Sequence, residues 1–323
     1  MRLADLGEFG LLDRLGLLSA GPAGGPGDDT AVLPLGDGVL LFTADALVEG
    51  VHFRLQWGRP EDLGWKTLAV NASDVAAMGG TPWAFTLTLS APPDLPVSWI
   101  EAFYRGLRDA ARTFGCFLAG GDTTAARDLT LSLALLGRAR NPILRSGARP
   151  GEDLYVTGFP GESAAGLALL QSGREALFPD LVLRHLRPEP RLALGRALGD
   201  TGAASALIDV SDGLLQDLGH LARASGVGAE VWAERVPVPA DLGRAAGVLG
   251  ADPREWVFGG GEDYELLFSA PPGQRRAVET LARAAATPVW RIGRVTPDLG
   301  VRVLDRGAPW APRRAGHDHF RSR

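Results

Sequence analysis

Aspartates repeatedly follow apolar segments along this chain, and several of them have a glycine as a neighbour. They stand at Asp45, Asp74, Asp122, Asp209 with Asp212, and Asp263 after Glu262, and a further pair, Asp28 and Asp29, lies in a glycine-rich stretch. Carboxylates at the ends of neighbouring strands converge, and crowded carboxylates repel one another unless cations lie between them. Mg²⁺ takes oxygen ligands and joins carboxylates to substrate phosphates. One such aspartate is readily explained as a helix cap or a turn residue, but the set predicts a site for several Mg²⁺ ions and a phosphorylated ligand.

Other kinds of nucleotide and metal site find no support in the sequence. Lys66 is the single lysine and does not follow the glycine pattern of a phosphate-binding loop, and the protein-kinase signatures His-Arg-Asp and Asp-Phe-Gly are absent. No pair of histidines has the spacing of zinc ligands. Glycines 259–261 fit an anion-binding turn or an ordinary tight turn equally well. Cys116 is the only cysteine, so we expect a small buried residue there and no disulfide.

Length and composition predict a two-domain globular protein. The chain has 323 residues, of which 46 % are hydrophobic and 22 % charged. The net charge is −5 and the arginines are scattered, which argues against nucleic acid as a partner. Acidic residues interrupt the N-terminal apolar segment, unlike in a signal peptide, and no apolar run approaches the ~20 residues that span a membrane. We therefore expect a cytoplasmic protein with no membrane partner.

Hydrophobic periodicity predicts alternating helices and strands, which favours an α/β or α+β fold. The expected helices are residues 4–18, 60–78, 98–114, 161–172, 191–198, 214–224 and 274–286. The expected strands are residues 39–42, 84–90, 117–119, 129–137, 154–157, 205–210, 266–269 and 289–295. Turn-forming residues at 145–152 mark the best domain boundary, which divides the chain into residues 1–145 and 146–323.

Seven segments, in family order along the chain, resemble those of the thiamine-monophosphate kinase family. They are residues 27–29, 43–53, 71–79, 120–124, 144–148, 208–214 and 260–266, and the likeness continues to the Asp-His-Phe at 318–320. Gly-Gly-Asp (120–122) and Ser-Asp-Gly (211–213) also occur in the wider superfamily of aminoimidazole ribonucleotide synthetase and selenophosphate synthetase. Glu-Gly-Val-His-Phe (49–53) and Gly-Glu-Asp-Tyr-Glu-Leu (261–266) are much more specific.

This resemblance implies an enzyme that phosphorylates thiamine monophosphate to thiamine diphosphate with ATP. It also implies an aminoimidazole ribonucleotide synthetase-like α/β (α+β) fold, with an N-terminal domain (1–145) for ATP, Mg²⁺ and dimerisation and a C-terminal α/β domain (146–323). The family is a homodimer whose N-terminal sheets form a shared barrel. Two other interpretations stay open: another ATP-dependent phosphotransferase or synthetase of the superfamily, and a non-catalytic regulator that binds nucleotide or metal.

The functional residues of the family carry over position by position. The implied metal ligands are Asp29, Thr43, Ala44 (through its backbone), Asp45, Asp74, Asp122, Asp209 and Asp212. The implied nucleotide contacts are Tyr104, Gly121, Asp122, Arg145 and Ser211. The implied substrate contacts are His52, Glu262 and His317.

Four of these residues form the predicted catalytic set. We expect Asp45, Asp74 and Asp122 to bridge metal ions and Arg145 to contact the transferring phosphate. The acceptor is a phosphate that is already anionic, so no general base is required. Charge neutralisation and alignment for in-line transfer carry the catalysis.

The sequence departs from the family pattern at two positions. Ala44 replaces a residue that commonly has a hydroxyl group, although a backbone carbonyl ligand would survive this change. His317 replaces the aromatic residue that packs the thiamine ring, a role that is open to His317, Phe320 or Trp310.

Overall fold

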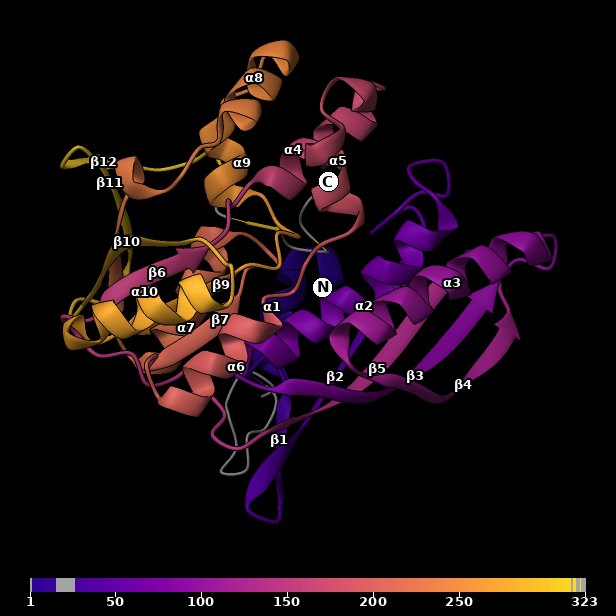
Figure 1. The fold of residues 1–323 in the computed structure, drawn as a ribbon. Coiled ribbons are helices and arrows are strands. Elements are labelled where there is room, and N and C mark those ends of the chain that lie inside the picture. The colour runs from indigo at the N-terminus through magenta and orange to yellow at the C-terminus, as the bar shows by residue number, and fades with distance from the viewer. Residues whose placement is uncertain (1, 16–26, 315, 318–319, 321–323) are drawn as a thin grey trace.

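The computed structural model describes residues 2–15, 27–314, 316–317 and 320, and its elements gather around two sheets (Figure 1). The first sheet has five strands in the order β1-β2-β5-β3-β4, and only β3 and β4 are parallel neighbours. The elements of this first part are α1 (Leu3–Arg14), β1 (Ala31–Leu35), β2 (Gly38–Val48), α2 (Pro60–Ala77), β3 (Thr81–Ala91), α3 (Val97–Phe114), β4 (Phe117–Ala125) and β5 (Thr130–Ala139).

Helices α2 and α3 lie side by side on one face of this sheet (Figure 1). The core that they form with the strands includes Leu41, Leu68, Phe85 and Phe103. Two glycines allow the helices to approach closely. A Cβ atom on Gly64 would lie 2.1 Å from the carbonyl oxygen of Phe103, and one on Gly106 would lie 1.9 Å from that of Glu61. This close packing fixes α2, which carries Asp74, over the sheet.

The second sheet has seven strands in the order β12-β11-β8-β10-β6-β9-β7, of which only β11 and β8 are parallel neighbours. Its strands are β6 (Asp153–Thr157), β7 (Ala206–Asp209), β8 (Gly228–Trp232), β9 (Leu266–Ala270), β10 (Val289–Thr296), β11 (Gly300–Asp305) and β12 (Ala308–Trp310). The helices of this part are α4 (Glu162–Gln171), α5 (Pro179–Leu186), α6 (Leu192–Thr201), α7 (Leu214–Ser225), α8 (Ala240–Leu249), α9 (Pro253–Gly259) and α10 (Arg275–Ala284), with short 3₁₀ turns at Glu175–Leu177, Ala233–Arg235 and Pro272–Gln274.

Helix α2 also joins the two parts of the molecule. Ala76 and Ala77 at its end belong to the same buried cluster as Leu198 of α6 and Leu207 of β7. A Cβ atom on Gly195 of α6 would lie only 2.2 Å from the Ala76 carbonyl oxygen, so a glycine is needed for this contact. The end of α2 is thereby held against β7, the edge strand of the second sheet.

Most predicted elements are confirmed, but the premise that the aspartates lie at strand ends is wrong for three of them. The strand predicted at 39–42 continues to Val48, because residues 43–48 pair with β5 throughout, and Asp45 lies inside it. Asp122 lies inside β4, which pairs with β3 as far as Ala125. Asp74 lies in the last turn of α2. Only Asp209 ends a strand, β7, as expected.

Other elements were missed or shortened. Seven elements have no counterpart among the predicted ones, namely β1, α5, β8, α8, α9, β11 and β12. The first helix ends at Arg14 and is kinked at Gly7, and residues 16–18 of the predicted helix lie outside the described residues.

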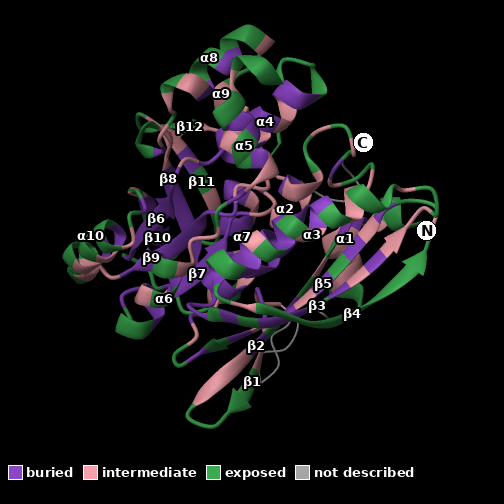
Figure 2. Cartoon of the chain, turned by 45° about the vertical axis from the view of Figure 1, so that its right-hand side comes forward, coloured by how far each residue is buried: buried purple, intermediate pink, exposed green. Residues whose placement is uncertain are grey.

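The five-stranded sheet is open in the single chain. Its edges are β1 and β4, and no sheet closes into a barrel within the described residues. Strand β4 is exposed along its whole length (Figure 2). On β2 the residues that point away from α2 and α3 (Phe42, Ala44 and Ala46) are exposed as well. Among the helices that the structure describes, none has the length and apolar character needed to cross a membrane.

Candidate active site

Three aspartates from distant parts of the sequence meet where the end of α2 reaches β7. Asp29 precedes β1, Asp74 lies in α2 and Asp209 ends β7, and carboxylate oxygens of all three lie within 4.8 Å of one another. Asp29 and Asp209 are buried, and Asp74 is half-buried. We call these three residues the acidic cluster. Its oxygen ligands and their spacing suit a hard divalent cation.

Each member of the acidic cluster has one polar partner. The Thr43 hydroxyl donates a hydrogen bond to Asp74, the Ser73 hydroxyl donates one to Asp209, and Arg145 donates one to Asp29 over 2.8 Å. Oδ2 of Asp29 is nevertheless buried without a hydrogen-bond partner in the part of the chain that the structure describes, as is Nε of Arg145. Buried polar atoms are rarely left unpaired. These two atoms therefore indicate that a ligand belongs at this place.

The carboxyl groups in and beside the acidic cluster have raised pKa values. Burial, and then the charge of Asp29, raises the pKa of Asp209 to about 8. Burial followed by the charges of Asp45, Asp209 and Asp29 raises the pKa of Asp74 well above its usual value. Burial raises the pKa of Asp45 to about 6. A cation among these groups would remove much of this cost.

Asp45 faces the acidic cluster because of the alternation of side chains along β2. Thr43, Asp45 and Leu47 are more buried than the residues between them, so they point toward α2. Ala44 is exposed on the opposite face of the sheet. Its missing hydroxyl group therefore removes nothing from the side of β2 that carries Asp45.

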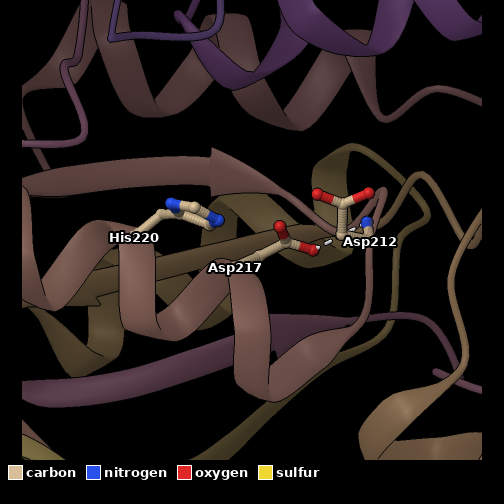
Figure 3. Close-up of side chains that lie close together, drawn as sticks. All are labelled: Asp212, Asp217 and His220. Atoms are coloured by element: carbon tan, nitrogen blue, oxygen red, sulfur yellow. Dashed lines mark hydrogen bonds between the residues drawn. The ribbon is translucent and has the colours of Figure 1, made fainter. Parts of the chain in front are cut away.

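The loop of residues 211–213, which follows β7, is held by a carboxylate that we did not predict. Oδ2 of Asp217 accepts hydrogen bonds from the backbone N–H groups of Ser211, Asp212 and Gly213 at 3.0–3.1 Å. Figure 3 shows the Asp217 carboxylate directed at the backbone of Asp212, whose own carboxylate points away from Asp217. Asp212, Asp217 and His220 also have ligand atoms within 4.8 Å of one another.

A second loop, residues 259–264, packs on the first. The N–H of Glu262 donates to the Ser211 carbonyl over 2.7 Å, and that of Tyr264 donates to the Val210 carbonyl over 2.8 Å. Glu262 and Tyr264 have φ angles of 62° and 53°, a left-handed conformation that is costly for residues other than glycine. Such strain is typical of functional sites. The loop therefore fixes Glu262 close to residues 211–213.

The Glu262 side chain lies among cationic and polar groups. Nζ of Lys66 is 2.9 Å from Oε1 of Glu262, and Nδ1 of His185 is 3.5 Å from Oε2. Burial alone would raise the pKa of Glu262, but the charge of Lys66 outweighs burial and holds it below its usual value. Lys66 and His185 also line a pocket together with His52, Trp57 and Trp99, among other residues.

Sequence and structure comparisons assign the family. Family models described as the N-terminal and C-terminal domains of AIR synthase related protein match residues 27–139 and 149–306. The chain is 41 % identical to thiamine-monophosphate kinase of Mycobacterium tuberculosis, over 95 % of this chain and 90 % of that protein, and 40 % identical to that of Escherichia coli K12, over 97 % and 98 %. The chain belongs to the thiamine-monophosphate kinase family. A solved structure described as "AaThiL complexed with AMPPCP and TMP" matches with a TM-score of 0.88 at 37 % identity, over 98 % of this chain and 99 % of that one.

Within one chain, this member of the thiamine-monophosphate kinase family does not bring every predicted site residue together. Gly121 and Asp122 lie on the exposed edge strand β4, and Tyr104 lies on α3, where it packs edge-on against Phe103. One row of paired residues crosses β2, β5, β3 and β4, and it consists of Ala46, Ser132, Thr88 and Asp122. Because neighbouring strands lie ~4.8 Å apart, Asp122 is roughly 14 Å from β2 along the sheet.

The three candidates for packing the thiamine ring are placed differently. The backbone N–H of His317 donates to the Asp212 carbonyl over 3.0 Å, and Gln216 donates to the His317 carbonyl over 2.6 Å, so His317 lies beside the 211–213 loop. The Trp310 ring packs on Phe258, 5.0 Å between centroids, as part of the C-terminal core. Phe320 is exposed. In this thiamine-monophosphate kinase family member, His317 is thus held beside Asp212, one of the predicted metal ligands.

One aspartate of the sequence pattern has a structural role, and four polar residues near the site were missed. Asp263 accepts hydrogen bonds from the N–H groups of Gly161 and Ser163 and thereby caps α4, away from the acidic cluster. The missed residues are Ser73, Asp217, Lys66 and His185. An acidic residue in the first turn of the helix after Ser-Asp-Gly was a signal for Asp217, since such residues reach back to free N–H groups. Nothing local to the sequence pairs Lys66 with Glu262.

Proposed function

We propose that the enzyme transfers the γ-phosphate of ATP to thiamine monophosphate in line, with several Mg²⁺ ions held by the acidic cluster. The observation that carries this proposal is the meeting of Asp29, Asp74 and Asp209 beside Arg145, where one buried oxygen and one buried N–H group have no partner among the described residues. Two relatives at 40–41 % identity are named thiamine-monophosphate kinase. The similar solved structure is described as a complex with AMPPCP, an analogue of ATP, and TMP.

The residues present fit Mg²⁺. Asp29, Asp74 and Asp209 offer hard oxygen atoms within 4.8 Å of one another, and Asp45 and the backbone carbonyl groups of Thr43 and Ala44 on β2 are the further ligands that we propose. Asp212 follows on the 211–213 loop. Bound Mg²⁺ would neutralise the phosphates of both substrates and so reduce their mutual repulsion. Because Asp209 and Asp212 lie beyond residue 145, we propose a site built by both predicted domains (1–145 and 146–323).

The residues of the chain itself would orient the substrates. Two hydrogen bonds hold Arg145: its guanidinium donates to Asp29, and its backbone N–H group donates to Asp28. The guanidinium is therefore fixed next to the acidic cluster. Its charge suits the phosphoryl group in transfer. Ser211 is fixed by Asp217 for contact with the nucleotide. The acceptor oxygen is already anionic, so none of these residues needs to remove a proton.

The proposal is tested by acceptor choice. The purified protein is incubated with ATP, Mg²⁺ and one of three acceptors: thiamine monophosphate, unphosphorylated thiamine or no acceptor. Thiamine diphosphate and ADP are expected in equal amounts with thiamine monophosphate only. ADP formation with thiamine, or without any acceptor at a similar rate, would contradict the proposal.

The raised carboxyl pKa values predict how stability depends on pH. In the metal-free folded protein Asp209 (pKa about 8) and Asp45 (pKa about 6) retain protons that an unfolded chain, with aspartate pKa values of about 3.9, has lost. Stability without metal should therefore fall as the pH rises from about 4 to about 8. Mg²⁺ needs ionised ligands, so the increase in Tm that it causes should grow over the same range. Thermal unfolding with Mg²⁺ or with EDTA measures both, and an increase that shrinks with pH would contradict the assignment.

We propose that Asp122 and Gly121 act in the site of a partner subunit of a homodimer. Asp122 is exposed on an edge strand that is unpaired on one side among the described residues, and the open face of the sheet carries exposed apolar residues such as Phe42 and Phe117. An exposed apolar edge strand is a template for pairing with another chain. If β4 pairs with the sheet of a partner subunit, the two sheets join and form part of the expected barrel. Asp122 then lies next to the sheet of the partner subunit.

Mixed dimers test this arrangement. Asp74→Asn and Asp122→Asn proteins are each expected to be inactive, but their co-expressed mixture should recover about a quarter of the wild-type activity, since half of the dimers then contain one intact site. A mixture of Asp74→Asn and Asp209→Asn should recover none, because both residues belong to the same chain's cluster. Equal recovery in the two mixtures, or a monomeric mass in solution, would contradict the proposal.

A further inference from the structure

The single lysine of the chain is buried at Glu262. Lys66 lies on α2, its side chain is only 3 % exposed, and its Nζ is 2.9 Å from Oε1 of Glu262. Burying an ammonium group is costly unless an anion is its partner. Lys66 and Asp74 are eight residues apart on one face of α2, which is ~12 Å along the helix axis. Helix α2 thus places Glu262 and the acidic cluster at two ends of one site.

The second oxygen of Glu262 is restrained as well. His185 Nδ1 lies 3.5 Å from Oε2 and 3.1 Å from the Ser163 hydroxyl. Burial, and then the charge of Lys66, lowers the pKa of His185 to about 3, so this ring is neutral. Among the described residues, Lys66 is therefore the charged group within 4.0 Å that holds the Glu262 carboxylate in place.

The Glu262 side chain remains reachable. It is 25 % exposed, whereas Lys66 and His185 are almost completely buried. Its backbone is held in a left-handed conformation by the bond from its N–H to Ser211. The buried Lys66 and His185 side chains thus restrain the Glu262 carboxylate, and the 211–213 loop restrains the backbone of Glu262. An ionised carboxylate is an acceptor only, which suits the amino group and the cationic ring of a thiamine compound.

We propose that Lys66 is a positioning residue, whose buried ammonium group orients the Glu262 carboxylate for contact with the heterocycle of the acceptor. This inference rests on the proposed function, in which Glu262 contacts thiamine monophosphate. Lys66 itself does not touch the reacting phosphates. Its effect should therefore appear in recognition of the acceptor, and recognition of ATP should be spared.

The test is a steady-state comparison of the wild-type, Lys66→Met and Lys66→Arg proteins. We expect Lys66→Met to raise KM for thiamine monophosphate about 10- to 100-fold, because the half-buried Glu262 carboxylate loses its charged partner. KM for ATP should change by less than about threefold, and Lys66→Arg, which keeps the charge, should restore part of the loss. Arg275→Met, which removes one of the two arginines that pair with Asp153 at the start of β6, is the matched control and should leave both KM values unchanged. A lower Tm with an unchanged KM for thiamine monophosphate in Lys66→Met would overturn the proposal.

A double variant makes the test independent of the folding of Lys66→Met. In Lys66→Met/Glu262→Gln both charges are removed, so no buried carboxylate is left alone. If Lys66 acts through Glu262, this protein should have the same KM for thiamine monophosphate as Glu262→Gln alone. A further increase in that KM would show that Lys66 acts by another route and would overturn the proposal. Failure of the wild-type protein to make thiamine diphosphate would instead contradict the proposed function.

Discussion

Replacing Asp74 by asparagine is expected to lower kcat for thiamine diphosphate formation about 10³-fold, since a metal ligand that serves the transition state is worth several kcal/mol. Thr43 can still donate its hydrogen bond to the asparagine oxygen, so the fold should persist. The metal-free variant should also be more stable than the wild type above neutral pH. Its neutral amide replaces a carboxyl group whose ionisation is opposed by burial and by Asp45, Asp209 and Asp29.

The opposite signs of these two effects separate a metal-binding role from a structural one. Activity should be lost while the Tm in EDTA rises, and the increase in Tm caused by Mg²⁺ should shrink or vanish. Asp252→Asn is the matched control, because Asp252 caps α9 at an exposed position and should affect neither activity nor the response to Mg²⁺. Near-normal turnover at saturating Mg²⁺ in Asp74→Asn would remove Asp74 from the metal site.

The Arg145→Met protein is expected to lose about 10³-fold in kcat, the lower end of the range for an arginine that stabilises a phosphoryl-transfer transition state. The guanidinium donates to Asp29, and its Nε atom is buried with no hydrogen-bond partner among the described residues. Burial alone would lower the pKa of Arg145, but Asp29 and Asp28 outweigh burial and raise it, so the group is always charged. Methionine keeps much of the volume and removes the charge.

Arg145→Lys distinguishes charge from geometry. A lysine keeps the charge but lacks the planar fork of the guanidinium. We therefore expect kcat of Arg145→Lys to exceed that of Arg145→Met by less than about tenfold. Arg294→Met, at a partly exposed pair with Glu230, is the control for loss of an arginine and should be fully active. Retention of more than about a tenth of the wild-type kcat in Arg145→Met would exclude contact with the transferring phosphate.

The composition of the acidic cluster was accessible from the sequence, but its geometry was not. The carboxylates that meet, Asp29, Asp74 and Asp209, all belong to the set that the pattern singled out. The assumption that they converge as strand ends fails, because Asp74 is delivered by a helix and Asp45 by the middle of a strand. Their convergence depends on the packing of α2 against β7 and α6, which includes the close contact between Gly195 of α6 and Ala76 of α2. No local sequence pattern indicates this packing.

The missed elements have physical explanations of the same kind. β8 starts with glycine and contains a glutamate, and β11 alternates Val with Arg and Leu, so neither has the apolar run of the other strands. These segments become strands because they pair with β10 and with each other, which is a tertiary effect. The Lys66–Glu262 ion pair was missed for a similar reason: it joins a helix of the first part to a strained loop of the second.

The dependence of the reaction on Mg²⁺ tests the central claim most directly. Thiamine diphosphate formation is measured at saturating ATP and thiamine monophosphate while free Mg²⁺ is varied, with EDTA as the zero point. We predict no turnover in EDTA and a rate that continues to rise after all of the ATP has bound one Mg²⁺ ion, because the acidic cluster must be filled as well. Turnover that persists in EDTA, or that saturates when Mg²⁺ equals ATP, would contradict the assignment of the acidic cluster as a site for several metal ions.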